Sequence, residues 1–145
     1  MNRFNLFFPM LAMFALTAVV LVILFRSRVR SVRERTVTTG YFKLYQGQVE
    51  PEYAAKAARH FTNLFEAPTL FYAVCLAAMV TQQADRALEV LAWAYVASRV
   101  AHTVIHLGIN EIVPRMVAYF SSWGVLLTMW IYLAVRVAAT GQAAG

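Results

Sequence analysis

Four long apolar blocks occupy most of this 145-residue chain, and each is long enough to cross a lipid bilayer. Only 14% of the residues are charged and 61% are hydrophobic, whereas about 25% of residues are charged in a typical soluble domain. We therefore predict an all-α integral membrane protein, a four-helix up-down bundle that forms a single domain over residues 1–145. The expected membrane spans are about 4–25, 61–80, 87–107 and 116–137.

The links between the later spans are short, which makes consecutive helices antiparallel neighbours. Asp85 is placed to cap the third span, Gly108 to end it and Pro114 to begin the fourth. We expect one continuous helix from Glu52 to the end of the second span. The preceding segment, residues 40–51, contains glycines and polar residues and is expected to be a mobile loop.

Basic residues concentrate between the first two spans, and this bias predicts the orientation. The positive-inside rule places this first loop in the cytoplasm and both termini on the other side, and we expect a bacterial inner-membrane location. The first apolar block is expected to be a retained span, because the positive charge follows it. The net charge of +6 needs no nucleic acid. Residues 26–35 are interpreted as an anchor for anionic lipids, with part of a ligand site as the alternative.

Two clusters of ionisable residues lie inside segments that otherwise suit lipid. They are Arg59-x-x-x-Asn63-x-x-Glu66 and Arg99-x-x-His102-x-x-x-His106, followed by Arg115 and Tyr119 at the start of the last span. A charge in hydrocarbon costs at least about 2.5 kcal/mol, so such residues normally face a bundle interior. Each cluster falls on one helical face, and the expected topology brings all of them to the cytoplasmic leaflet. We predict one shared polar site.

Glu66 is the only acidic residue in these clusters, so the site has surplus positive charge. We expect Glu66 to pair with Arg59 or Arg99 inside the membrane. The remaining cation could receive an anionic ligand, most naturally a carboxylate. Structural roles remain open for several members: Asn63 as a bridge between helices, His102 as a packing residue, Arg115 as a cation that reaches the headgroups and Tyr119 as an interfacial aromatic.

The single cysteine, Cys75, lies within an apolar block and excludes an intrachain disulfide. A buried, inert thiol is the expected state, with a reactive thiol as the alternative. Two histidines and one remote cysteine do not make a zinc-ligand set, so we predict no metal site.

The chain resembles the MAPEG family, membrane-associated proteins of eicosanoid and glutathione metabolism, in two segments. These are residues 58–66, Ala-Arg-His-Phe-Thr-Asn-Leu-Phe-Glu, and residues 98–108, Ser-Arg-Val-Ala-His-Thr-Val-Ile-His-Leu-Gly. The second is similar to the microsomal prostaglandin E synthase branch, and the chain resembles a bacterial-type member. Pro114-Arg115 and Tyr119 fall where that branch carries a glutathione-contacting arginine and tyrosine.

This resemblance implies a homotrimer that binds glutathione between subunits near the cytoplasmic leaflet. The residues implied to bind glutathione are Arg59, Asn63, Glu66, Arg99, His102 and His106. Arg115 and Tyr119 would be catalytic and stabilise the thiolate. The chain departs from the branch at Thr62 and Glu111, where basic residues are expected, and at His106, where a tyrosine is expected.

The first functional hypothesis is a glutathione transferase or peroxidase that acts on a lipophilic small molecule arriving from the lipid. The alternative is a non-catalytic accessory or ligand-binding protein with a degenerate pocket, associated with another membrane protein. A small transporter is disfavoured because the polar residues occupy one leaflet. Nothing in the sequence supports a prostaglandin substrate.

Overall fold

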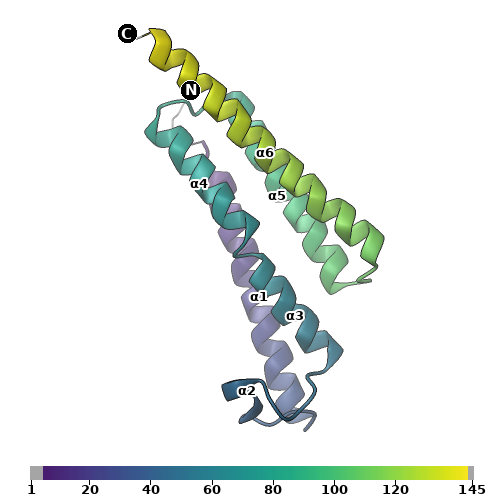
Figure 1. Ribbon diagram of the computed structural model, residues 1–145. Coiled ribbons are helices and arrows are strands. Elements are labelled where there is room, and N and C mark those ends of the chain that lie inside the picture. The colour runs from purple at the N-terminus through teal and green to yellow at the C-terminus, as the bar shows by residue number, and fades with distance from the viewer. Residues whose placement is uncertain (1–4, 144–145) are drawn as a thin grey trace.

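The computed structural model describes residues 5–143, with side chains described up to residue 140. Over this part of the chain there are six helices and no strand. They are α1 (Phe7–Arg33), α2 (Tyr41–Leu44), α3 (Glu52–Asn63), α4 (Ala67–Val80), α5 (Arg86–Leu107) and α6 (Ile112–Ala143). The long helices alternate in direction along one axis (Figure 1). The all-α helical bundle is therefore confirmed, while the expected start of the first span at residue 4 lies outside the described residues.

Three helical segments are long and apolar enough to cross a membrane: Phe7–Arg33, Glu52–Val80 and Ile112–Thr140. Large apolar side chains on their outer faces are exposed, including Phe14 at 63% and Val135 at 63%, which suits contact with hydrocarbon. The third expected span, 87–107, corresponds to α5, which is 22 residues long but carries several charged and histidine side chains. Its crossing of the membrane stays a prediction.

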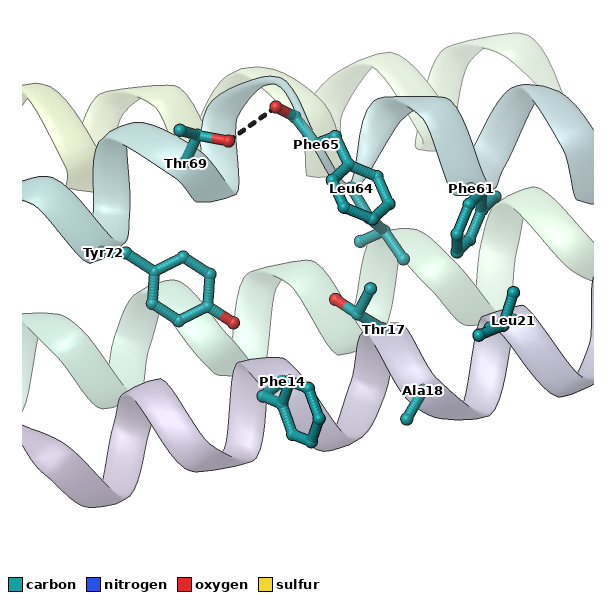
Figure 2. Close-up of a pocket in the computed structure, with 9 residues that line it drawn as sticks. All are labelled: Phe14, Thr17, Ala18, Leu21, Phe61, Leu64, Phe65, Thr69 and Tyr72. Atoms are coloured by element: carbon teal, nitrogen blue, oxygen red, sulfur yellow. Dashed lines mark hydrogen bonds between the residues drawn. The ribbon is translucent and has the colours of Figure 1, made fainter.

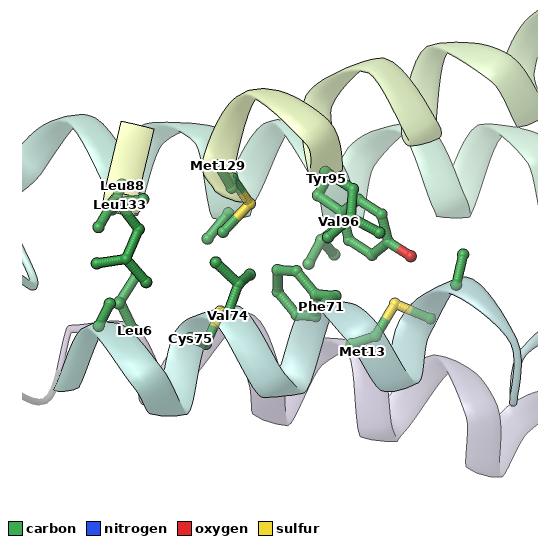
Figure 3. Close-up of a cluster of buried hydrophobic side chains, with 14 of the residues drawn as sticks. Leu6, Met13, Phe71, Val74, Cys75, Leu88, Tyr95, Val96, Met129 and Leu133 are labelled. Carbon is green, nitrogen blue, oxygen red and sulfur yellow. The ribbon is translucent and has the colours of Figure 1, made fainter. Parts of the chain in front are cut away.

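The apolar core occupies the half of the bundle that contains α4 (Figure 3). Side chains from α1, α4, α5 and α6 meet there, and the rings of Phe71 and Tyr95 stack with centroids 4.5 Å apart. Cys75 is fully buried in this core as a free thiol, as expected. The polar residues of the two clusters lie in the other half of the bundle, which contains α3.

The expected continuous helix from Glu52 to Val80 is wrong, because the helix breaks between α3 and α4. Residues 64–66 form a turn, and Pro68 lies at the start of α4. Proline has no backbone N–H and disfavours helical conformation in the residue before it, which explains a break at this point. The break frees the backbone carbonyl of Asn63 for a partner outside its own helix.

The predicted ends of α5 are confirmed. The Asp85 carboxylate accepts a hydrogen bond from the Leu88 N–H at 3.0 Å, which is an N-cap. Gly108 is the C-cap, and a Cβ at this position would lie 2.8 Å from the Val104 carbonyl oxygen. Pro114 lies in the first turn of α6, where its missing N–H is tolerated.

The loop between α1 and α3, expected to be mobile, contains the short helix α2. Tyr41 of this helix is buried, and its ring contacts the ring of Tyr45 with centroids 5.6 Å apart. The Arg28 guanidinium donates a hydrogen bond to the Tyr45 hydroxyl at 2.8 Å and lies over the ring of Phe42. One of the basic residues after the first span therefore has a structural role in holding α2 against α1.

Candidate functional site

A polar cavity of about 380 Å³ lies between α3, α5 and α6, in the half of the bundle opposite the apolar core. Its lining residues are Arg59, Asn63, His102, His106, Arg115, Met116, Tyr119 and Phe120. The volume falls within the range of about 300–1,000 Å³ that is typical of small-molecule sites. Six of the eight residues singled out from the sequence thus line one cavity, and the other two, Arg99 and Glu66, lie elsewhere.

Arg99 lies behind the cavity and is fully buried. Its Nη2 donates a hydrogen bond of 2.7 Å to the Asn63 side-chain oxygen and a longer one of 3.4 Å to the Asn63 carbonyl. This carbonyl is available because α3 ends at Asn63. The Nε and Nη1 atoms of Arg99 have no hydrogen-bond partner among the described residues. Arg99 therefore ties α5 to the end of α3 through an amide and not through a carboxylate.

Glu66 is exposed, and the expected ion pair with Arg59 or Arg99 is wrong. None of the four ion pairs among the described residues includes Glu66. Its carboxylate accepts one long hydrogen bond, 3.4 Å, from the Asn63 side-chain nitrogen. The physical reason is the break after α3, because Glu66 sits at the N-cap of α4 and no longer continues the face that carries Arg59 and Asn63.

Arg115 and Tyr119 reach the cavity from the first turns of α6. The Arg115 guanidinium donates to the Asn110 side-chain oxygen at 2.9 Å, and its backbone carbonyl lies 3.3 Å from His102 Nδ1. The Tyr119 ring lies 5.8 Å from the His102 ring, centroid to centroid. Asn110 was missed in the sequence, although its position just after a helix end suits the left-handed conformation it adopts, φ 53°.

His60 is a further residue that sequence reasoning missed. It is fully buried, and its ring stacks on the His106 ring with centroids 4.9 Å apart. A signal was available, because His60 shares a helical face with Ala57 and Leu64, which are both buried. The sequence prediction of no metal site rests on two histidines, and the structure brings His60 to the same place as a third.

The cavity has cationic character. Arg59 and Arg115 line it, Arg99 lies behind it, and its lining residues within the described chain include no carboxylate. Guanidinium groups can bind a carboxylate with two parallel hydrogen bonds. They can also stabilise a thiolate by charge, and a tyrosine hydroxyl can donate a hydrogen bond to the same sulfur. The arrangement is therefore suited to an anionic ligand that carries a thiol.

A second cavity of about 480 Å³ lies between α1 and the α3–α4 segment (Figure 2). Phe14, Phe61, Leu64 and Phe65 contribute apolar surface, and the residues of this cavity are not shared with the polar cavity. Its threonine hydroxyls bond to nearby backbone carbonyls: the Thr69 hydroxyl donates to the Phe65 carbonyl, in the turn before α4, at 2.6 Å. This cavity has the mostly apolar surface expected of a site for an apolar chain. Tyr72 lines it, but no cationic side chain does, so it lacks the positive charge that would stabilise a thiolate.

The match to a family model agrees with this geometry. The model of the MAPEG family matches residues 6–135, which is most of the chain, and the chain therefore belongs to the MAPEG family. Together with the three apolar helical segments, this makes it an integral membrane protein with a helical-bundle fold. No curated protein and no solved structure matches the chain significantly.

Proposed function

We propose that the protein is a membrane glutathione transferase or glutathione-dependent peroxidase that acts on lipophilic electrophiles. The observation that carries this proposal is the convergence of Arg59, Arg115 and Tyr119 on one cavity from two separate helices. Membership of the MAPEG family is consistent with glutathione-related chemistry. Glutathione is an anionic peptide with a thiol, and the cationic cavity matches both properties.

Arg59 and Asn63 would bind the carboxylate end of glutathione, because they line the wall formed by α3. Arg115 and Tyr119 would stabilise the thiolate on the opposite wall. The thiolate then attacks the electrophilic carbon and forms a thioether, while the leaving group departs as an anion. Alternatively it attacks a hydroperoxide, which releases the alcohol and leaves a sulfenic acid that a second glutathione converts to the disulfide and water. The lipophilic substrate would arrive from the bilayer, which the exposed apolar faces of α1 and α6 contact.

Assembly and orientation are part of the same proposal. The polar cavity opens at the surface of one chain, so a neighbouring subunit of a homotrimer would supply a further wall. The basic end of α1, with Arg30 and Arg33 in its last turn, would lie at the cytoplasmic leaflet of a bacterial inner membrane beside anionic lipids. Glutathione would then enter from the cytoplasm.

A non-catalytic ligand-binding or accessory role is the second candidate, and one observation favours it. Thr62 stands where the prostaglandin E synthase branch has a basic residue, and its hydroxyl donates to the Ala58 carbonyl of its own helix at 3.2 Å. This side chain therefore supplies no cation to a ligand. A cavity with fewer anion contacts binds glutathione more weakly or binds another anion, and it could serve a partner membrane protein.

Calorimetric titration of the full-length protein in mild detergent tests the proposal. We expect saturable binding of glutathione at millimolar concentrations and equal binding of S-methylglutathione, which tests the anion contacts without the thiolate. Arg59→Gln should weaken binding about tenfold, the effect of one charge-assisted hydrogen bond. Arg26→Gln is the matched control, because Arg26 is exposed on α1 and does not line the cavity. An absence of binding by both glutathione and S-methylglutathione would favour the accessory role.

A further inference from the structure

All three histidines of the chain meet at one place. The sequence contains three histidines, and the structure brings His60 on α3 together with His102 and His106 on α5. They are 0%, 3% and 8% exposed. One ring nitrogen of each lies within 4.8 Å of those of the other two. Residues at positions i and i+4 share a helical face, so His102 and His106 form one side of the cluster and His60 the other.

The hydrogen bonds of His60 show which of its nitrogens carries the lone pair. Its Nε2 lies 2.9 Å from the Thr103 hydroxyl oxygen. That hydroxyl has a single proton, which it donates to the Arg99 carbonyl at 2.8 Å. Nε2 of His60 must therefore be the protonated nitrogen and donate to Thr103. Nδ1 then has the free lone pair, and it is buried without a partner among the described residues.

His102 is oriented in the same way. Its Nδ1 lies 3.3 Å from the Arg115 backbone carbonyl, which can only accept, so Nδ1 carries the proton. Nε2 has the lone pair, and it is also buried without a described partner. Metal-binding histidines typically donate their other ring N–H to a carbonyl or another acceptor, which fixes the tautomer. Both His60 and His102 have this arrangement.

His106 completes the set. Neither of its ring nitrogens meets the geometry of a hydrogen bond to a described residue, although the Lys56 backbone lies near the ring. His106 can therefore present either nitrogen to the other two. In a tetrahedral zinc site with bonds of about 2.0–2.1 Å, ligand nitrogens lie roughly 3.4 Å apart. Metal binding would require the imidazole rings, two of which are stacked, to turn until nitrogens now within 4.8 Å of one another reach that separation.

We propose that His60, His102 and His106 bind one divalent transition-metal ion of the zinc type, with a fourth coordination position open to the polar cavity. His102 and His106 line that cavity, so the open position faces it. Three neutral imidazoles do not reduce the +2 charge of the ion, and Arg59, Arg99 and Arg115 add positive charge nearby. This positive charge favours an anionic fourth ligand, such as hydroxide, chloride or a thiolate, over neutral water. The site does not require that glutathione be a substrate.

Cobalt(II) is the probe, because it enters zinc sites and its ligand-field absorption reports tetrahedral coordination. The full-length protein is purified in mild detergent with a tag that contains no histidine, stripped with a chelator and titrated with cobalt(II). We expect one ion per chain, a tetrahedral visible spectrum and displacement by zinc. Azide should change the spectrum by occupying the open position. An unchanged spectrum with azide would overturn the open position, and no saturable cobalt or zinc binding would overturn the site.

Variants distinguish the loss of a metal ligand from a loss of folding. His60→Gln and His106→Gln should each abolish the tetrahedral spectrum, while size-exclusion chromatography shows that the protein remains monodisperse. Thr103→Val keeps all three imidazoles but removes the acceptor for His60 Nε2, and it should weaken metal binding about ten- to hundredfold. Cys75→Ala is the matched control, because this buried thiol is outside the cluster. Full cobalt binding by His60→Gln would show that the three histidines are not the ligands.

Discussion

The Nη2 atom of Arg99 lies 2.7 Å from the side-chain oxygen of Asn63, and this hydrogen bond joins the buried face of α5 to the last residue of α3. Arg99 is fully buried, so this hydrogen bond helps to compensate its charge for the loss of water. The side-chain oxygen of Asn63 faces the guanidinium, and its side-chain nitrogen donates a long hydrogen bond of 3.4 Å to the Glu66 carboxylate. Behind the polar cavity, α5 and α3 are thus joined by a hydrogen bond to an amide and not by an ion pair.

Asn63→Leu should destabilise the protein by about 2–3 kcal/mol, because it leaves a buried guanidinium without its main acceptor. SDS-titration unfolding of the detergent-solubilised protein measures this change. Thr62→Ala is the control, since Thr62 is exposed and bonds only to its own helix, and it should change stability by less than about 0.5 kcal/mol. Adding Arg99→Met to Asn63→Leu should recover stability, because an apolar pair removes the buried charge.

Glu66→Gln should change the free energy of unfolding by no more than about 0.5 kcal/mol, because the side chain is exposed and makes one long hydrogen bond. The same SDS titration measures it. A loss as large as that of Asn63→Leu would mean that Glu66 pairs with a buried cation after all.

Helical periodicity was enough to place six of the eight expected residues around one cavity. Arg59 and Asn63, and likewise His102 and His106, share a face whatever the tertiary packing, because positions i and i+4 lie on the same side of a helix. The fold class followed from the apolar blocks for a similar reason, since hydrocarbon permits few alternatives to helices.

Helical periodicity could not predict the hydrogen-bond partner of Arg99, because this partner depends on a break in the helix. Opposite charge suggested Glu66 for Arg99, but the turn at residues 64–66 moved Glu66 off the shared face. Pro68 is the sequence signal for this turn, because proline disfavours helical conformation in the residue before it. His60 directly follows Arg59 and lies three residues before Asn63, so it falls at the edge of their shared face. Only tertiary packing shows that it meets His102 and His106 of α5.

Asp85→Ala should destabilise the protein by about 1 kcal/mol through loss of the N-cap of α5. The carboxylate also accepts from the Tyr132 hydroxyl at 2.6 Å and lies 3.7 Å from Arg136. Burial acts to raise the pKa of Asp85, but the Leu88 N–H, the Tyr132 hydroxyl and the charge of Arg136 together outweigh it and lower this pKa.

Because the pKa of Asp85 is lower in the folded protein, its stabilising effect is complete above the unfolded value of about 3.9. This contribution is lost as the pH falls through the folded value. Asp85→Asn keeps an acceptor for the Leu88 N–H without a titrating charge, so its stability should vary less with pH below about 4. Thermal unfolding of both proteins across this pH range provides the comparison, and parallel curves would refute the assignment.

Arg115→Ala and Tyr119→Phe should each lower the turnover of chloronitrobenzene with glutathione by about ten- to a hundredfold, because each removes one group that stabilises the thiolate. Asn110→Ala should cause a smaller loss, since it releases the Arg115 guanidinium without removing its charge. Arg136→Ala is the matched control, an arginine on the same helix that lies near Asp85 and not at the cavity. Equal turnover in all four variants would exclude a role for the α6 residues.

The central claim is that the polar cavity ionises a bound thiol, and ultraviolet difference absorbance on adding glutathione measures thiolate directly. We expect the wild-type protein to give a saturable thiolate signal near neutral pH at millimolar glutathione. The double variant Arg115→Ala/Tyr119→Phe should lose this signal while it still binds S-methylglutathione. If the wild-type protein binds glutathione but forms no thiolate and turns over no electrophile, the enzyme proposal is wrong, and the protein is a ligand-binding member of its family.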